Sequence, residues 1–284
     1  MNDKSPVSLT GYFTGQVWCE NAYSEPEMGS VLGKSLYYIH RPVGWLNERL
    51  FGNNLETMLI QRHKLIDALT LEAIEQNPTL QILEIASGLS SRAQRILKQA
   101  DDAGLNIRYV EADLPQMVNW KQARLGKLRF SHPEHSVEPI NILRESGPLS
   151  LNAILDSHFD RNKPILVITE GLVNYFELST IENFWRSLRG ALATFKHGEY
   201  IFEIWPKLPV YQEQLTYHWG VSLIEMFTRQ RVPLHYTSDE SVAQGLKECG
   251  FSTVNVLNPN EVSQQYGLPK MQGECLFRVT RAIV

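Results

Sequence analysis

Small and acidic residues gather at three places where an apolar run of the chain ends. The first run passes into EIASGLSSR (84–92), whose small residues would let a ligand approach the backbone closely. The second ends in YVEADLP (109–115), and its Asp113, more than twenty positions beyond the turn, suits hydrogen bonding to ribose hydroxyls. The third ends in TEGLVNY (169–175), where Glu170 places a carboxylate before a glycine. Each acidic residue also has an ordinary explanation, because Asp113 could cap a helix and Glu170 could be solvated.

The elements that would position these residues alternate between strand and helix. Short apolar runs bounded by turn residues predict strands at 80–86, 106–113, 136–142, 164–171, 198–205, 251–257 and 274–282. The intervening segments predict helices at 91–104, 114–125, 149–160, 178–195 and 240–250, after a first one at 55–76. This alternation indicates a largely parallel sheet covered on both faces, while the loop between the last two strands favours an antiparallel final strand. The predicted fold class is α/β: a Rossmann-like, seven-stranded, mostly parallel sheet with a reversed strand, as in class I methyltransferases.

Two segments stand outside the alternation. Residues 1–78 are interpreted as an N-terminal helical arm that is irregular over 1–33, and 79–284 as the core. An aromatic-rich insert at 205–236 interrupts the core and predicts either a lid over the site or an ordinary hydrophobic core. Its aromatic residues are Trp205, Tyr211, Tyr217, Trp219, Phe227 and Tyr236. We expect 1–284 to form a single domain with a lid.

Composition and missing motifs argue against several classes of function. The net charge of −4 argues against a nucleic-acid partner, because phosphate binding needs clustered basic residues. Three distant cysteines, a first segment without an apolar leader and the lack of a long apolar run predict a cytoplasmic protein with no membrane partner. His132 and His135 have no third ligand in sight, so no metal is expected. The hydrolase motif G-x-S-x-G, the phosphate loop G-x-x-x-x-G-K-S/T and the G-x-G-x-x-G of NAD-dependent oxidoreductases are all missing.

The motifs together resemble those of the leucine carboxyl methyltransferase family over about residues 56–205. These are S-adenosylmethionine (SAM)-dependent O-methyltransferases, and they include a protein phosphatase methyltransferase, a tRNA-modifying branch and bacterial enzymes of polyketide biosynthesis. The family's first motif, an acidic residue, Leu-Gly-x-Gly and Asp-Thr-Arg, is matched at Glu84, Gly88 and Arg92, but Ala86 replaces its first glycine and Ser90 its aspartate. The family's Arg ahead of Asp is matched by Arg62 and Asp67. Its Glu-x-Asp-x-Pro followed by Lys is matched by Glu111, Asp113, Pro115 and Lys121. Its Glu-Gly-x-x-x-Tyr is matched by Glu170, Gly171 and Tyr175.

This resemblance implies a binding site for SAM. The cofactor-binding residues that it implies are Arg62, Glu84, Ala86, Gly88, Asp113, Asn141, Ile142 and Glu170. Arg62 would pair with the methionine carboxylate, for which its bidentate geometry is suited, and Asp113 would hold the ribose hydroxyls. Glu170 would lie near the cationic methionine part. Asn141 and Ile142 stand where the family has an Asp-Leu pair that touches adenine, and Asn141 could still hydrogen-bond the exocyclic amine.

On the acceptor side, the candidate residues are Tyr175, His218 and His235, together with Tyr236, although packing roles are common for such residues. Methyl transfer from a sulfonium is an in-line displacement in which a carboxylate acceptor needs no base and a hydroxyl benefits from one. The leading hypothesis is a SAM-dependent O-methyltransferase acting on a carboxylate or hydroxyl of a small molecule. A protein C-terminus or tRNA as acceptor, and a degenerate methyltransferase-fold module that binds without catalysis, are the alternatives. A homodimer is left open.

Overall fold

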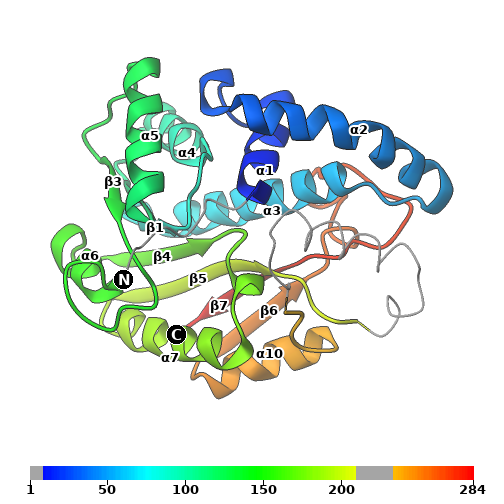
Figure 1. Cartoon of the computed structure of the whole chain (residues 1–284). Coiled ribbons are helices and arrows are strands. Elements are labelled where there is room, and N and C mark those ends of the chain that lie inside the picture. The colour runs from blue at the N-terminus through cyan, green and yellow to red at the C-terminus, as the bar shows by residue number, and fades with distance from the viewer. Residues whose placement is uncertain (1–8, 209–232) are drawn as a thin grey trace.

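The computed structural model describes residues 9–208 and 233–284, in which a central sheet carries helices on both faces (Figure 1). Its seven strands have the order β3-β2-β1-β4-β5-β7-β6. The bounds of the strands are β1 Gln81–Ile85, β2 Arg108–Asp113, β3 His135–Pro139, β4 Pro164–Thr169, β5 His197–Ile204, β6 Thr253–Leu257 and β7 Arg278–Ile283. The first five strands pair in parallel, whereas β7 runs antiparallel to both β5 and β6. The predicted Rossmann-like α/β fold with a reversed final strand is therefore confirmed.

Alternating side chains give the sheet two apolar faces, each covered by helices (Figure 1). On one face Ile82 and Leu166 pack against α3 (Leu55–Gln76) and α4 (Arg92–Asp102), and α5 (Pro115–Leu128) packs against β3 beside them. On the other face Leu83 and Val167 belong to a core shared with three helices. These helices are α6 (Leu151–His158), α7 (Leu178–Leu192) and α10 (Asp239–Glu248). Burial on both faces explains why the central strands appear in the sequence as continuous apolar runs.

The strand register brings the three predicted loops to one edge of the sheet. Ile85 pairs with Ala112 of β2 on one side and with Thr169 of β4 on the other. The strands β1, β2 and β4 therefore end level with one another, and this brings the turn after β1, Asp113 and Glu170 to the same edge of the sheet. The strand order changes direction between β1 and β4, and doubly wound sheets bind their ligands at this switch point.

The N-terminal segment is more regular than predicted. Residues 1–33 were expected to be irregular, but α1 spans Leu9–Glu20, a 3-10 turn η1 spans Pro26–Met28, and α2 begins at Val31 and runs to Phe51. Gly33 marks a close contact between α1 and α2, since a Cβ on this residue would lie 2.4 Å from the Tyr12 carbonyl oxygen. For residues 9–33 the expectation was wrong because tertiary packing, with Val17 and Trp18 buried, overrides weak local propensity.

The predicted insert at 205–236 lies mostly outside the described residues. This includes His218 and four of its aromatic residues, Tyr211, Tyr217, Trp219 and Phe227. At its two described ends the aromatic residues pack into the hydrophobic core, as one of the two alternatives predicted. Trp205 is buried with its ring 5.7 Å from that of Phe277, and Tyr236 stacks on Trp185 with the ring centroids 6.3 Å apart. Among the helices of the described ranges, none has the length and apolarity to cross a membrane.

Candidate functional site

The turn after β1 has the backbone shape of a ligand-binding turn. Ala86 and Gly88 both adopt the left-handed conformation, with φ of 58° and 51°. The Gly88 N–H donates to Asp113 Oδ2 at 2.8 Å, which joins the turn to the end of β2. A Cβ on Gly88 would have its nearest neighbour 4.0 Å away, at the Ala86 carbonyl oxygen, so the backbone faces open space. The geometry allows a ligand to reach this backbone and the Asp113 carboxylate together.

Asp113 uses each carboxylate oxygen once within the protein. Oδ1 accepts the Leu114 N–H at 2.7 Å, in addition to the Gly88 bond on Oδ2. Burial raises the pKa of Asp113, while the two N–H groups oppose this effect. A carboxylate oxygen can accept more than one hydrogen bond, so both oxygens retain capacity for a pair of hydroxyl donors.

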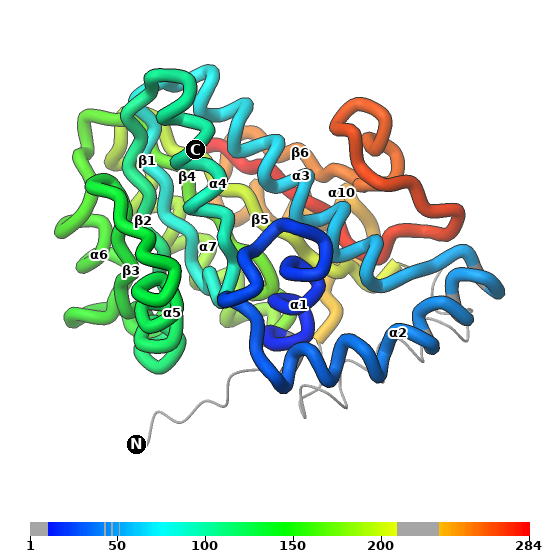
Figure 2. The backbone as a smooth tube through the Cα atoms, turned by 90° about the horizontal axis from the view of Figure 1, so that it is seen from above, coloured from blue at the N-terminus to red at the C-terminus, as the bar shows by residue number. Residues whose placement is uncertain are grey.

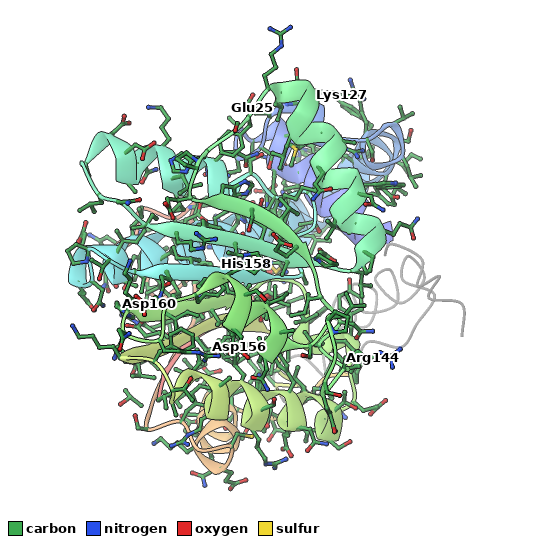
Figure 3. All side chains as sticks on the ribbon, turned by 90° about the vertical axis from the view of Figure 1, so that its left-hand side faces the viewer. Glu25, Lys127, Arg144, Asp156, His158 and Asp160 are labelled. Atoms are coloured by element: carbon green, nitrogen blue, oxygen red, sulfur yellow. The ribbon has the colours of Figure 1, made fainter. Side chains whose placement is uncertain are left out.

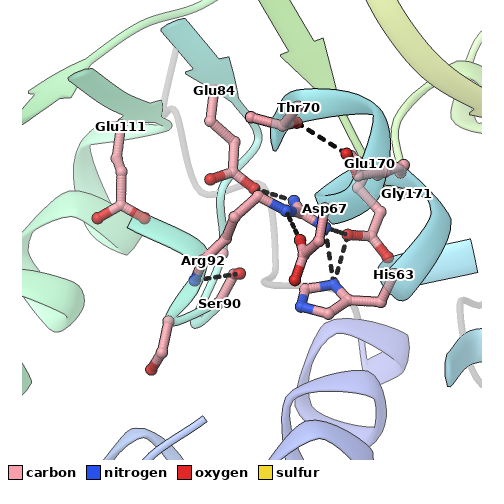
Figure 4. A network of polar contacts seen from close by, with 12 residues as sticks. His63, Asp67, Thr70, Glu84, Ser90, Arg92, Glu111, Glu170 and Gly171 are labelled. Carbon is pink, nitrogen blue, oxygen red and sulfur yellow. Dashed lines mark hydrogen bonds and ion pairs between the residues drawn. The ribbon is translucent and has the colours of Figure 1, made fainter. Parts of the chain in front are cut away.

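Glu170 lies at the centre of a buried ionic network at the end of β4 (Figure 4). Its Oε1 accepts from Arg62 Nε at 2.8 Å, and its Oε2 accepts from Arg92 Nη2 at 2.6 Å and lies 2.8 Å from His63 Nδ1. Although burial would raise the pKa of Glu170, His63, Arg62 and Arg92 outweigh it and hold this pKa well below its ordinary value. Glu170 is therefore a carboxylate fixed by cationic neighbours, neither solvated nor a helix cap.

Arg92 connects Glu170 to the first motif. Its guanidinium is fully buried and binds Asp67 at 2.5 Å and Glu84 at 2.5 Å, besides Glu170. The second oxygen of Glu84 accepts the Tyr109 hydroxyl at 2.7 Å. Glu84 is almost completely buried, and both of its oxygens are bonded within the protein, so its contribution to a bound ligand would act through Arg92 rather than by contact.

Arg62 reaches the same network from α3. Besides Glu170, its Nη1 lies 3.4 Å from Glu203 Oε1, and its Nη2 takes part in neither bond. Glu203, at the end of β5, also accepts the Gly171 N–H with both oxygens, at 2.7 and 2.8 Å. Burial raises the pKa of Glu203 to about 7, against the opposing effect of Arg62. The structure therefore places Arg62 between two carboxylates, Glu170 and Glu203, and the motifs predicted neither contact.

Sequence reasoning missed both His63 and Glu203. His63 is fully buried, and burial together with Arg92 lowers its pKa. Its Nε2 lies 2.7 Å from Arg95 Nη2, and its Nδ1 lies 2.8 Å from both Glu170 Oε2 and Arg92 Nη2. Because Nε2 faces only a donor, the neutral tautomer with its proton on Nδ1 suits these partners best. A signal existed only for Glu203, because a carboxylate between two apolar residues of a buried strand must find a buried partner.

The residues predicted to touch adenine follow β3. The Ile140 N–H donates to the Asp113 carbonyl at 2.8 Å, which brings this loop beside Asp113. The Asn141 side chain accepts the Leu143 N–H at 3.0 Å and is partly exposed, and Ile142 packs at the edge of the core. The loop therefore extends the same edge of the sheet beyond Asp113.

The predicted acceptor-side residues are only partly brought together. Tyr175 lies in η2 (Val173–Tyr175), on the loop that follows β4, and it contributes to the raised pKa of Arg62. His235 is buried, and its Nε2 is 2.7 Å from the Phe176 carbonyl oxygen, so it braces the loop that carries Tyr175. Tyr236 faces away from the site, toward Glu182 of α7. His218 lies outside the described residues.

The N-terminal arm covers the turn after β1. The Trp18 ring lies 4.6 Å from the His63 ring, and Ser24 Oγ accepts the Ser91 N–H at 3.1 Å. Under this cover the hydroxyls of Ser87 and Ser91 are buried without a hydrogen-bond partner. Unpaired buried hydroxyls are costly unless a ligand or water satisfies them, so these two groups are available to a polar ligand that reaches the turn.

Other features of the described residues lie away from this site. Two surface hollows lie elsewhere, one between α6 and α7 beside Asp156 and one near His158 and Asp160. Figure 3 labels these three residues. The candidate site is therefore assigned from the chemistry of its residues and not from a surface hollow. Within the described ranges no group of three His, Cys, Asp or Glu side chains could hold a metal. His132 lies 3.2 Å from Asp101, and His135 2.8 Å from Glu111.

Comparisons with known proteins place this chain among methyltransferases. Two curated proteins of Mycolicibacterium paratuberculosis, assigned as S-adenosyl-L-methionine-dependent methyltransferases, are 33% identical over 105 residues and 32% identical over 121 residues. These matches cover 37% and 43% of this chain, but only 31% and 36% of the relatives, so the chain spans about a third of the length of the curated relatives it matches.

Solved structures agree at the level of the fold. A methyltransferase structure from Thermobifida fusca superimposes with a TM-score of 0.62 at 14% identity, covering 99% of this chain and 96% of that one. The CMeT domain of the citrinin polyketide synthase has a TM-score of 0.52 at 13% identity, covering 95% and 68%. The model of the leucine carboxyl methyltransferase family matches residues 46–187, which are half of the chain and carry every motif from Arg62 to Tyr175. The chain belongs to the leucine carboxyl methyltransferase family.

Proposed function

We propose that this protein binds SAM and transfers its methyl group to a carboxylate or hydroxyl oxygen of a small-molecule acceptor in the cytoplasm. The observation that carries the proposal is the bond from the Gly88 N–H to Asp113 at the switch point of the sheet. It joins a left-handed turn with open space before it to a carboxylate that suits a ribose diol. The family membership supports the same cofactor.

The residues at the site fit SAM in their chemistry. The ligand has a carboxylate, a diol and a cationic sulfur, and the site offers the Nη2 donors of Arg62, the free lone pairs of Asp113 and the anionic Glu170. The unpaired Ser87 hydroxyl lies in the same turn. Bound SAM supplies an activated methyl group on a positively charged sulfur.

The roles of the chain's own residues follow from these contacts. Arg62 would bind the methionine carboxylate while Glu170 and Glu203 hold its guanidinium in place. The backbone at Ala86 and Gly88 would line the methionine part. Asn141 and Ile142, on the loop tied to the end of β2, would contact the adenine.

The acceptor would approach from the loop after β4. Tyr175, on this loop, could touch the acceptor. His235 would position Tyr175 through its bond to the Phe176 carbonyl. Aligning the acceptor with the methyl group and excluding water can account for roughly 7–11 kcal/mol of the barrier. A carboxylate acceptor would need no further group, whereas a hydroxyl would benefit from a base. The net charge of −4 favours a small molecule over tRNA.

Isothermal titration with SAM tests the cofactor. We expect binding that Asp113→Asn and Arg62→Met each weaken by about tenfold or more, since each removes a charged hydrogen-bond partner. Asp101→Asn, on the exposed end of α4, is the matched control and should bind as the parent does. Failure of the parent to bind SAM would refute the proposal, and equal binding by all variants would show that the site is misplaced.

The fate of the methyl group tests the oxygen acceptor. SAM labelled in its methyl carbon would be incubated with the protein and a metabolite extract, and the labelled products would be treated with alkali. A carboxyl methyl ester releases labelled methanol under these conditions, whereas a methyl ether is stable. Label found only on nitrogen, carbon or sulfur would contradict O-methylation while leaving SAM binding intact.

A further inference from the structure

Helix α2 carries an unusual concentration of exposed apolar side chains. Of nine large hydrophobic residues that are exposed in the described ranges, seven belong to this one helix. They are Val31, Leu32, Tyr38, Ile39, Trp45, Leu46 and Leu50, with exposed fractions from 44% to 86%. Figure 2 shows α2 at the outer edge of the molecule, beyond α1. We call these seven residues the α2 stripe.

The spacing of the α2 stripe is that of a helix-packing surface. Val31, Tyr38 and Trp45 follow one another at seven-residue intervals, and so do Leu32, Ile39 and Leu46. Seven residues are close to two helical turns, so each set forms a line along one side of the helix. From Val31 to Leu50 the stripe runs for roughly 28 Å at 1.5 Å per residue. A side of this length and regularity matches another helix.

The opposite side of α2 is already packed. Gly33 lies against the backbone of α1, and Tyr37 is buried with its hydroxyl 2.9 Å from Glu56 Oε1. The Ser30 side chain accepts the Gly33 N–H at the start of the helix, and Gly52 closes it with a φ of 70°. The helix is therefore fixed by other contacts, and the α2 stripe is not needed for its own folding.

The area of the α2 stripe is suited to a stable protein interface. Seven large side chains that are exposed by about half present on the order of 600 Å² of apolar surface. This is at the upper limit for the largest apolar patch of a typical monomer. It is close to the roughly 800 Å² that each partner buries in a standard interface, and polar residues beside the stripe would add the rest.

We propose that the α2 stripe binds a second copy of this chain, with the two α2 helices antiparallel about a two-fold axis near Arg41. A two-fold axis makes one surface its own partner, as in most homodimers. Residues 32 and 50 lie equally far from position 41, so Leu32 of one copy would meet Leu50 of the other. Lys34 and Glu48 also lie equally far from it, so the same arrangement forms two ion pairs. The exposed Arg41 side chains are long enough to extend from the axis into water.

Sedimentation velocity of the full chain from low to high micromolar concentration tests the dimer. We expect a species of twice the chain mass of 32.5 kDa. Ile39→Glu and Trp45→Glu should each raise the dimer dissociation constant by about a hundredfold or more, because each places a charge in a buried apolar seam. Leu143→Glu, at an exposed apolar residue on a loop away from α2, is the matched control and should leave the dimer intact. Circular dichroism should show all three variants folded.

A charge exchange tests the antiparallel arrangement. Lys34→Glu should weaken the dimer roughly two- to fivefold, and Lys34→Glu combined with Glu48→Lys should restore it. A chain that stays monomeric at every concentration would refute the proposal, and so would a dimer that survives both stripe variants. A monomer that co-sediments with anionic phosphatidylserine vesicles, and loses this with Trp45→Glu, would assign the stripe to a membrane surface instead.

Discussion

The buried carboxylate of Glu203 makes the stability of this protein depend on pH in a specific way. Its side chain is 6% exposed, and it accepts the Gly171 N–H and lies 3.4 Å from Arg62 Nη1. Burial raises its pKa from the ordinary 4.5 to about 7. The substitution Glu203→Gln removes the titrating group and keeps a side-chain oxygen that can accept the Gly171 N–H.

The sign and size of the effect follow from linkage. Between pH 4.5 and pH 7 the unfolded chain has lost the proton of Glu203 while the folded chain still holds it, so the free energy of unfolding falls as the pH rises. At about 1.4 kcal/mol per pH unit, this window corresponds to about 3 kcal/mol. In the Gln variant this contribution is missing. As the pH rises from 4.5 to 7, the free energy of unfolding of the variant should therefore increase by about 3 kcal/mol relative to that of the parent.

Urea unfolding at several pH values between 5 and 8 measures this difference. The exposed Glu145→Gln is the matched control, and its difference from the parent should be constant over the range. Groups that titrate in both proteins cancel in the comparison, so the changing difference belongs to Glu203. A Glu203→Gln difference that stays constant with pH would refute the argument, because it would mean that Glu203 ionises in the folded protein as it does in the unfolded one.

Three further substitutions test the strain and the ionic networks, all by urea unfolding near neutral pH. Ala86→Gly should stabilise the fold by about 0.5 kcal/mol, because relief of the strain of a left-handed alanine (φ of 58°) exceeds the entropy that a glycine loses on folding. A marked loss of stability would contradict strain at this position. Arg92→Met should cost about 3–5 kcal/mol because it leaves the buried Glu84 without its cation and removes one of the cations around Glu170 and Asp67, and a cost under about 1 kcal/mol would contradict a charged Glu84. Lys121→Met should cost somewhat less, because it removes the lysine from the buried Glu111 but leaves His135 beside it, and adding Glu111→Gln should recover most of the loss; no recovery would argue against this pairing.

The sequence was most informative where local pattern decides the structure. The helix 55–76 begins and ends as predicted because Asn54 caps its start and Asn77 and Pro78 follow its end. Each predicted strand is present. For β1 and β4, burial on both sides of the sheet produces an apolar run that the sequence shows directly. Asp113 and Glu170 could be placed together because each directly follows such a strand. In contrast, α1 was missed because its stability comes from contacts with α2 and α3 rather than from its own residues.

The ionic network could not be predicted for a different reason. Glu170 binds His63 from a position 107 residues away along the chain, and Arg62 lies near Glu203 across 141 residues. No spacing rule connects such positions. Family motifs supplied Arg62 and Arg92, but they gave no indication that these two cations share one carboxylate. Only the packing of α3 against the ends of β4 and β5 decides that arrangement.

The two departures from the family motif are compatible with a working site because the turn keeps its geometry despite them. Ala86 holds the left-handed conformation that a glycine would adopt freely, at a cost of about 1 kcal/mol, and the Gly88 N–H still reaches Asp113. Ser90 retains a hydrogen-bonding role, since its Oγ accepts the Arg92 N–H at 3.1 Å where α4 begins. The charge that an aspartate would add at this position is not needed to balance Arg92, which already binds three carboxylates. Because the backbone of the turn and the carboxylate at its end are both in place, the sequence changes at 86 and 90 favour a strained but intact methyltransferase site over a degenerate one.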